Sequence, residues 1–486
     1  MNYLNSYVGY TILLIFAIFC IGKAFWGIRD KSNIGTDFLS AKNSIPFGIV
    51  VASLVANWTW SATILGGGEG AYSFGVSGIW IFGIDVILSA IIFSPLIVKI
   101  IKMVPSITTF PEFIRLRIGK KSHMIFTIVS MAQMLCFTLV QILATGIVFK
   151  TMFGIPHWQG AIIGGMIITA FVAIGGLRAA IDTSSIFSYA ILIALFILVI
   201  GSFKGGGGFT QIFEGIKNSD VPEAAFLFSK EAIIGYWLID FFTYINYALI
   251  NQNVWEHVLA VKPGNERKLT VTAAFIWFFI PAGAAVIGLV GLSMNLDVPG
   301  SDIILAVIMQ TMPVWASYIL AAVLIASIFS TASTCLNAFT NLLVTDLYKQ
   351  YFPKAKFISD ADMMQKKIRI IIITSGILIS IFAIMQFSIL WFNYAVGALA
   401  VPLLWPFVLS AFKENLNRKS VEMGLYAGIV TSVFFAFLPT LEVYTLPFDL
   451  WIGFALIHVV TIVVPLIGTA IKPDNEFRFS SLKEIE

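Results

Sequence analysis

Long apolar stretches separated by short polar segments run through the whole chain. A helix needs about 20 apolar residues to cross the hydrocarbon core of a membrane. These stretches do not alternate between apolar and polar positions as a half-buried strand would. The pattern therefore predicts thirteen membrane-spanning helices, near residues 7–27, 45–67, 77–100, 122–149, 158–176, 180–203, 231–253, 269–294, 314–345, 367–387, 390–411, 421–439 and 447–470.

The composition supports a helical membrane protein. Hydrophobic residues make up 58% of the chain and charged residues only 12%, whereas a soluble domain carries about a quarter charged residues. So few charges cannot cover a water-facing surface of this size, which argues against a soluble enzyme or regulator. The predicted fold class is an all-α integral membrane protein.

The distribution of positive charge predicts the orientation of the chain. If the N-terminus faces outside, only four of the 30 basic residues fall in outer segments, namely Lys150, Lys204, Lys217 and Lys230. Cytoplasmic loops of membrane proteins are enriched in Lys and Arg. We therefore expect a multi-pass protein of the cell (plasma or inner) membrane, with the N-terminus outside and the C-terminus in the cytoplasm.

The second predicted span contains an unusual polar segment. Asn57, Thr59, Ser61 and Thr63 are interleaved with tryptophans and precede the glycine-rich residues 66–70. Such a segment is typical of a discontinuous helix, whose freed backbone carbonyl groups can bind a cation. The alternative is a continuous helix in which hydroxyl groups bond to their own backbone and the glycines permit close packing.

The seventh span is similarly polar. Spacings of three to four residues place four of its polar side chains on one helical face, namely Asp240, Tyr244, Tyr247 and Asn251. This pattern also favours a discontinuous, solute-facing helix. The alternative is that the amide residues 251–253 lie at the cytoplasmic interface.

The ninth span carries a stripe of hydroxyl groups, formed by Ser327, Ser330, Thr331 and Thr334. Such a stripe can serve only helix packing, through hydrogen bonds to neighbouring helices. It can also supply neutral oxygen ligands to Na⁺, a hard cation that needs about five or six oxygen atoms.

Isolated polar residues in other spans are further candidates, because polar groups at membrane depth usually serve a function. They are Asp85 on the third span and Gln133 and Gln141 on the fourth. The alternative for Asp85 is a buried acid that is protonated or bonded to a neighbouring helix.

The two discontinuous spans lie five spans apart, so they cross the membrane in opposite senses. This spacing predicts two inverted five-helix repeats with a binding site between them, the organisation of an alternating-access transporter. The expected parts of this single domain are an extra N-terminal helix (7–27), the repeats (45–203 and 231–411), two C-terminal helices (421–470) and a cytoplasmic tail (472–486).

Several motifs resemble the sodium:solute symporter family over nearly the whole chain. In the ninth span, Ser330 and Thr331 precede an Asp346-Leu347-Tyr348 ending, as a hydroxyl pair does in proline and sugar members. Gly175-Gly176 is similar to the family's turn between core helices, and Pro111-Glu112-Phe113 is similar to its inner loop. Residues 53–65 (SLVANWTWSATIL) look most like the urea and polyamine branch.

The resemblance implies a LeuT-type fold with a sodium site between the second and ninth spans. Its ligands would be the backbone carbonyls of Val55, Trp58 and Ser327 and the hydroxyls of Ser330 and Thr331. Many relatives carry Thr-Asp after the Gly-Gly turn, where this chain has Thr183 followed by Ser184. The acid of an additional cation site is therefore missing.

We accordingly predict Na⁺-coupled symport of a small neutral or zwitterionic organic solute, urea-like or amino-acid-like, by a protein that acts as a monomer in the lipid bilayer and binds no nucleic acid. No basic residue lies deep in a span, which disfavours a dianionic solute. The predicted solute-binding residues are Asn57, Trp60, Asp85, Gln133, Tyr244, Asn246, Tyr247 and Asn251.

Three alternatives remain. Protons could couple transport through Asp85 or Asp240. The same fold could serve as a membrane-embedded sensor of a solute. An intramembrane enzyme is disfavoured, because the chain contains no HExxH or GxSxG pattern. Glu256 and His257 are expected to form a solvated pair at the inner end of a helix.

Overall fold

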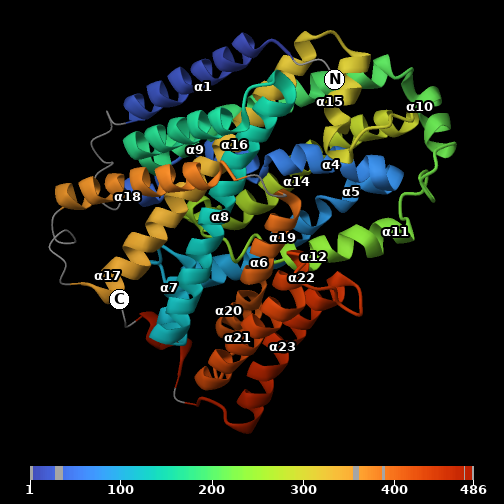
Figure 1. Ribbon diagram of the computed structural model, residues 1–486. Helices are drawn as coiled ribbons and strands as arrows, with labels where there is room; N and C mark the ends of the chain where they lie inside the picture. Colours follow the sequence, from blue (N-terminus) through green and yellow to red (C-terminus); the bar gives the residue numbers. More distant parts are fainter. Residues whose placement is uncertain (1–3, 28–36, 354–360, 386–388, 476, 484–486) are drawn as a thin grey trace.

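The computed structural model describes residues 4–27, 37–353, 361–385, 389–475 and 477–483. All regular elements in these ranges are helices (Figure 1). The all-helical fold class is therefore confirmed.

Helices occupy all thirteen predicted ranges. They are α1 (Ser6–Gly27), α3 (Phe47–Trp58), α4 (Ser61–Phe74), α6 (Ile84–Met103), α8 (Lys120–Phe153), α9 (His157–Gly205), α12 (Leu238–Tyr244), α13 (Gln252–Ala260), α14 (Glu266–Ser293), α16 (Trp315–Asn341), α18 (Ala361–Phe382), α19 (Ile389–Ala400), α20 (Leu404–Phe412), α21 (Arg418–Ser432) and α23 (Leu450–Ile471). Within the described ranges, nine helices are long and apolar enough to cross a membrane. The protein is therefore a multi-pass membrane protein, while the count of thirteen crossings stays a prediction.

Short helices also form in segments where the hydrophobic pattern predicts only loops or span ends. They are α2 (Asp37–Ser40), α5 (Gly78–Ile81), α7 (Phe110–Arg117), α10 (Gly208–Lys217), α11 (Lys230–Ala232), α15 (Ile303–Thr311), α17 (Lys349–Tyr351) and α22 (Leu438–Thr440). Wider π-type turns extend three of the helices, at Ile233–Trp237, Leu342–Tyr348 and Val433–Phe437.

Both polar spans are interrupted, as predicted. Thr59 adopts extended backbone angles (φ −87°, ψ 95°) and ends α3, after which α4 starts at Ser61. The seventh span stops at Tyr244, and α13 begins only at Gln252. The expected single helical face is therefore wrong beyond Tyr244, because residues 245–251 are not part of a continuous helix.

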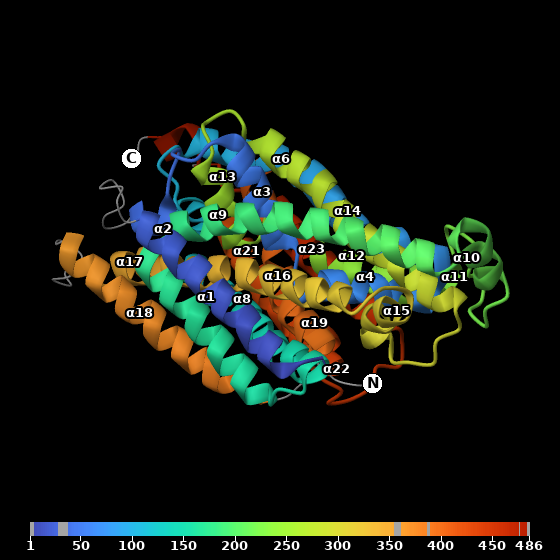
Figure 2. The same cartoon turned by 90° about the horizontal axis from the view of Figure 1, so that it is seen from above.

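The helix α16 lies in the centre of the molecule. It packs against α8, α9, α3 and α13, and almost all of its side chains are buried. The helices α1 and α18 cover the side where α9 lies, whereas α21 and α23 pack together at the opposite edge (Figures 1 and 2). A site between α16 and the interrupted helices is thus shielded from lipid.

Buried polar contacts hold the segments at one end of α16. Asp346 accepts a hydrogen bond from Thr109 Oγ1 at 2.9 Å and pairs with His123 Nε2 at 2.8 Å. Glu256 accepts hydrogen bonds from Asn337 Nδ2 (3.0 Å) and Asn341 Nδ2 (2.9 Å).

The predicted solvated pair of Glu256 and His257 is wrong. Glu256 is 1% exposed and His257 is 0% exposed. His257 Nε2 contacts Ser53 Oγ at 2.9 Å, so its partner lies on α3. The reason is that α13 packs against α3 and α16 inside the bundle and does not end at its surface.

The Gly175-Gly176 motif forms the turn expected between the fifth and sixth spans. Gly176 has a φ of 60° and divides α9 into two legs. A Cβ atom at this position would collide with the backbone oxygen of Phe38. Glycine is therefore required at position 176 for two reasons, the positive φ and the close approach of the Phe38 backbone.

This requirement predicts the effect of Gly176→Ala on stability. Gly264→Ala is the matched control, because Gly264 also has a positive φ (89°) but no atom lies within 4 Å of the place where a Cβ would be added. Each variant places alanine at an unfavourable φ, at a cost of about 1–2 kcal/mol, and only Gly176→Ala adds a backbone collision. We expect Gly176→Ala to lower the thermal unfolding midpoint in detergent clearly more than the control does. Equal losses would contradict this explanation.

Candidate functional site

The interruption between α3 and α4 turns backbone oxygen atoms toward α16. The Thr331 hydroxyl on α16 donates to Asn57 O at 2.9 Å and lies 3.4 Å from Thr59 O. These carbonyls lie at the point where the helical ladder stops, so they need partners from another element. A side-chain hydroxyl of α16 supplies one.

The hydroxyl stripe of α16 meets the interruption through some of its members. Thr334 Oγ1 donates to Asn57 Oδ1 at 2.7 Å. Ser330 is 1% exposed, and its hydroxyl has no hydrogen-bond partner among the described residues. Ser327 Oγ instead donates to Leu324 O within its own helix. The stripe thus provides two hydroxyls that bond to Asn57, from Thr331 and Thr334, and one hydroxyl, from Ser330, that has no partner among the described residues.

Two of the carbonyls predicted to bind sodium already accept protein hydrogen bonds. Val55 O accepts from Thr59 N at 3.1 Å and from Thr59 Oγ1 at 2.8 Å. Trp58 O accepts from Thr63 Oγ1 at 3.1 Å. In both cases at least one partner is a side-chain hydroxyl, which can rotate away without unfolding the helix.

An amide bridge joins the two interrupted helices. Asn253 Nδ2, on α13, donates to Asn57 Oδ1 at 2.7 Å and lies 3.1 Å from Thr334 Oγ1. One cluster thus connects α3, α13 and α16. Residues 251–253 are buried, so placing them at the cytoplasmic interface is not supported.

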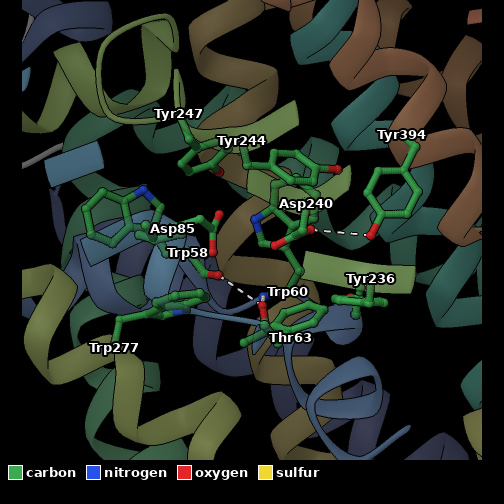
Figure 3. Close-up of a pocket in the computed structure, with 13 residues that line it drawn as sticks. Trp58, Trp60, Thr63, Asp85, Tyr236, Asp240, Tyr244, Tyr247, Trp277 and Tyr394 are labelled. Carbon is green, nitrogen blue, oxygen red and sulfur yellow. Dashed lines mark hydrogen bonds between the residues drawn. The ribbon is translucent and has the colours of Figure 1, made fainter. Parts of the chain in front are cut away.

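A cavity of about 70 Å³ lies beside the interruptions. Aromatic rings form most of its wall, and two carboxyl groups face it (Figure 3). The lining residues are Trp58, Trp60, Ala62, Thr63, Phe82, Asp85, Val86, Tyr236, Asp240, Tyr244, Tyr247, Trp277 and Tyr394. Four of the predicted solute-binding residues are therefore brought together here, namely Trp60, Asp85, Tyr244 and Tyr247.

The other four predicted solute-binding residues do not line the cavity. Asn57 is held by Asn253 and Thr334, as described above. Asn246 Nδ2 donates to Thr243 O at 3.1 Å, and Asn251 Oδ1 caps α13 by accepting from Asn253 N at 3.0 Å. Gln133 is buried on α8, away from the cavity lining.

The two carboxyl groups of the cavity come from different helices. Asp85 lies in the first turn of α6 and Asp240 on α12, and both side chains line the cavity. The Tyr394 hydroxyl donates to Asp240 Oδ1, at 3.4 Å. None of the described residues that line the cavity is basic.

Sequence reasoning missed several residues of the wall. Phe82, Tyr236, Trp277 and Tyr394 lie in or beside apolar spans, where an aromatic residue gives no signal of its own. Asp240 belongs to the polar cluster of the seventh span but is not among the predicted solute-binding residues. An intramembrane carboxyl group is the one signal that could have added it.

Comparisons with known proteins agree on the family. The family model described as "Sodium:solute symporter family" matches residues 38–428. A urea-proton symporter of rice (DUR3) is 21% identical over 88% of this chain, and a probable urea active transporter of fission yeast is 23% identical over 71%. The matched regions span only 65% and 55% of those two proteins. A sodium/glucose cotransporter of Vibrio parahaemolyticus is 24% identical over 97% of this chain and 92% of its own length.

Solved structures share the fold. A Na⁺-coupled sialic acid symporter in a substrate-bound outward-open state superposes with a TM-score of 0.78 and 17% identity, covering 97% of this chain and 99% of that one. MhsT in complex with L-phenylalanine superposes with a TM-score of 0.53 and 16% identity, covering 86% and 99%. These similarities support the predicted LeuT-type fold.

The family model covers most of the chain, and the interrupted helices and the fold agree with it. The chain therefore belongs to the sodium:solute symporter family of membrane transporters.

Proposed function

We propose that this protein is a Na⁺-coupled symporter of a small organic solute that works by alternating access. The observation that carries the proposal is the contact of Thr331 Oγ1 with the carbonyl oxygens of the α3–α4 interruption. The Ser330 hydroxyl lies on the same helix and has no partner among the described residues. Neutral oxygens suit a hard monovalent cation. The Vibrio relative is a sodium/glucose cotransporter and the sialic acid symporter is Na⁺-coupled, and both similarities support sodium as the coupling ion.

The proposed ligands are the five oxygen atoms expected from the family resemblance. They are the carbonyls of Val55, Trp58 and Ser327 and the hydroxyls of Ser330 and Thr331. When Na⁺ binds, the Thr59 hydroxyl would turn away from Val55 O, and Thr331 would exchange its hydrogen bond for an ion contact. The ion would then fasten α3 to α16.

Trp58 links the ion site to the solute cavity. Its carbonyl oxygen belongs to the interruption, while its indole ring lines the cavity and lies 6.5 Å from the Trp277 ring. Fixing the backbone of Trp58 therefore also fixes part of the cavity wall. Ion binding would order the solute site in this way, which is the basis of coupling.

The driving force is sufficient for uptake. One charge moving across 100 mV provides about 2.3 kcal/mol. Since about 1.4 kcal/mol corresponds to a tenfold ratio, one ion supports an accumulation of roughly fifty-fold. Both proposed repeats lie in one chain, so one copy would suffice, with its N-terminus outside and its C-terminus in the cytoplasm.

Proton coupling is the second candidate. It is favoured by the presence of Asp85 and Asp240 in one cavity, since carboxyl groups that share a site readily retain a proton. The rice relative is described as a urea-proton symporter. In this version the pair would take up a proton from outside and release it inside.

Removing the hydroxyl ligands should abolish stabilisation by Na⁺. For the purified wild-type protein, Na⁺ at ten times its Kd should add about 1.4 kcal/mol relative to K⁺ at equal ionic strength. The double variant Ser330→Ala with Thr331→Ala should show no such difference in its thermal unfolding midpoint.

The control for this variant is Thr340→Ala. Thr340 is equally buried on α16, and its hydroxyl donates only to Leu336 O within the same helix. This variant should retain the response to Na⁺. The ion site would be refuted by an equal response to Na⁺ in all three proteins.

Gradient-driven uptake into proteoliposomes distinguishes the two coupling ions. A panel of radiolabelled ureides, amino acids, sugars and polyamines should contain a solute that accumulates with an inward Na⁺ gradient. Dissipating the pH gradient should leave this accumulation unchanged. Accumulation that follows the pH gradient in the absence of Na⁺ would favour proton coupling, and stabilisation by a solute that is never transported would favour a sensor.

A further inference from the structure

Two carboxyl groups, the acid pair Asp85 and Asp240, face the cavity without a basic residue beside them. Asp85 is 1% exposed and Asp240 is 5% exposed. An ionised carboxylate in this cavity would have no Lys or Arg among the described lining residues to neutralise it. Burying an unpaired charge is costly, so a positively charged ligand would stabilise the ionised form.

One carboxylate oxygen is still open to a ligand. Asp85 Oδ1 is buried and has no hydrogen-bond partner in the described part of the chain. Asp85 also lies in the first turn of α6, where the helix dipole favours a negative charge. The open oxygen therefore points to a donor that arrives with the solute.

The walls of the cavity suit a flat cation. The rings of Trp58, Trp60 and Tyr244 line the same cavity as the acid pair, and Figure 3 shows the carboxyl groups among them. The Tyr244 ring lies 6.1 Å from that of Tyr394, which donates to Asp240. Aromatic faces attract positively charged groups that sit over them.

Buried tryptophan N–H groups raise the competing possibility of a neutral amide. Trp58 Nε1 and Trp277 Nε1 have no partners among the described residues, and they could donate to a carbonyl oxygen such as that of urea. The cost of burial favours a cation over a neutral amide. A buried carboxylate without a positive partner is far more costly than an unpaired neutral N–H group.

The geometry of a carboxyl group narrows the class of cation further. Guanidinium and acetamidinium are planar cations that carry several N–H groups. Their N–H groups can bond to a carboxylate in pairs, which a quaternary ammonium ion cannot do.

From these observations we propose that Asp85 and Asp240 form the subsite for a planar, positively charged nitrogen group of the transported solute, of the amidinium or guanidinium kind. This inference rests on the proposed transport function and narrows the expectation of a neutral or zwitterionic solute. The cation neutralises the carboxylate, as a basic side chain would. The aromatic rings contact the flat face of the cation and fix its orientation.

Three small molecules of nearly identical shape test the inference, because acetamidinium, acetamide and acetate carry charges of +1, 0 and −1. Their binding to the purified full-length protein in saturating Na⁺ is measured by titration of tryptophan fluorescence. We expect acetamidinium to bind at least about tenfold more tightly than acetamide, and acetate not to bind. Guanidinium should show the same preference over urea.

Variants assign the preference to the acid pair. Asp240→Asn should reduce the preference for acetamidinium to less than about threefold, whereas Asp240→Glu should keep most of it. The control is Asp220→Asn, at an acid outside the cavity, which should change nothing. Stabilisation by Na⁺ that persists in Asp240→Asn shows that this variant is folded.

The outcomes separate this inference from the proposed function. Acetamide binding as tightly as acetamidinium, or no binding of either while Na⁺ still stabilises the protein, would overturn the cation subsite and leave Na⁺ coupling standing. A preference that survives in both Asp85→Asn and Asp240→Asn would overturn its assignment to the acid pair. Absence of any response of the wild-type protein to Na⁺ would refute the proposed function itself.

Discussion

The need to satisfy backbone polar groups away from water governs the architecture of this protein. A helix that stops in the middle of a membrane domain leaves carbonyl oxygens without partners, and this is tolerated only where protein or a bound ligand supplies them. At the α3–α4 interruption the partner is the hydroxyl of Thr331. The central position of α16, buried on nearly all sides, follows from the same requirement.

The proposed ion site and the cavity lie on two sides of one interruption. The peptide segment around Trp58 presents the oxygen atoms of Asn57 and Thr59 to Thr331 of α16, and the Trp58 indole ring lines the cavity. The amide bridge from Asn253 to Asn57 ties the second interrupted helix to the same point. Small changes at the proposed ion site can therefore reach the cavity and the packing of both helices, which is the type of coupling that a symporter requires.

The residue types along the sequence predict where helices are interrupted, but they do not predict which distant elements pack together. The interruptions were predictable because Asn57, Thr59 and Ser61 are too polar for a continuous span. The hydroxyl stripe also singled out Thr331, which contacts the α3–α4 interruption. Asp85 stood out as an intramembrane acid. These signals come from residues whose type is costly at their position.

Contacts between distant elements were not predictable in this way. The spacing of Tyr247 and Asn251 suggested a helical face, but the chain unwinds before it reaches them. Glu256 and His257 look solvent-exposed from their position in the sequence, and only the packing of α13 shows that they are buried. Trp277 and Tyr394 reach the cavity from helices whose local sequence is ordinary.

The most direct test of the central claim is a structure of the protein determined in Na⁺. The account predicts an ion between α3 and α16, coordinated by Val55 O, Trp58 O, Ser327 O, Ser330 Oγ and Thr331 Oγ1 at about 2.4 Å, a typical distance between a hard cation and its oxygen ligands. The hydrogen bond from Thr331 to Asn57 O would then be broken. Retention of that hydrogen bond at saturating Na⁺, with no ion at the interruption, would contradict the account.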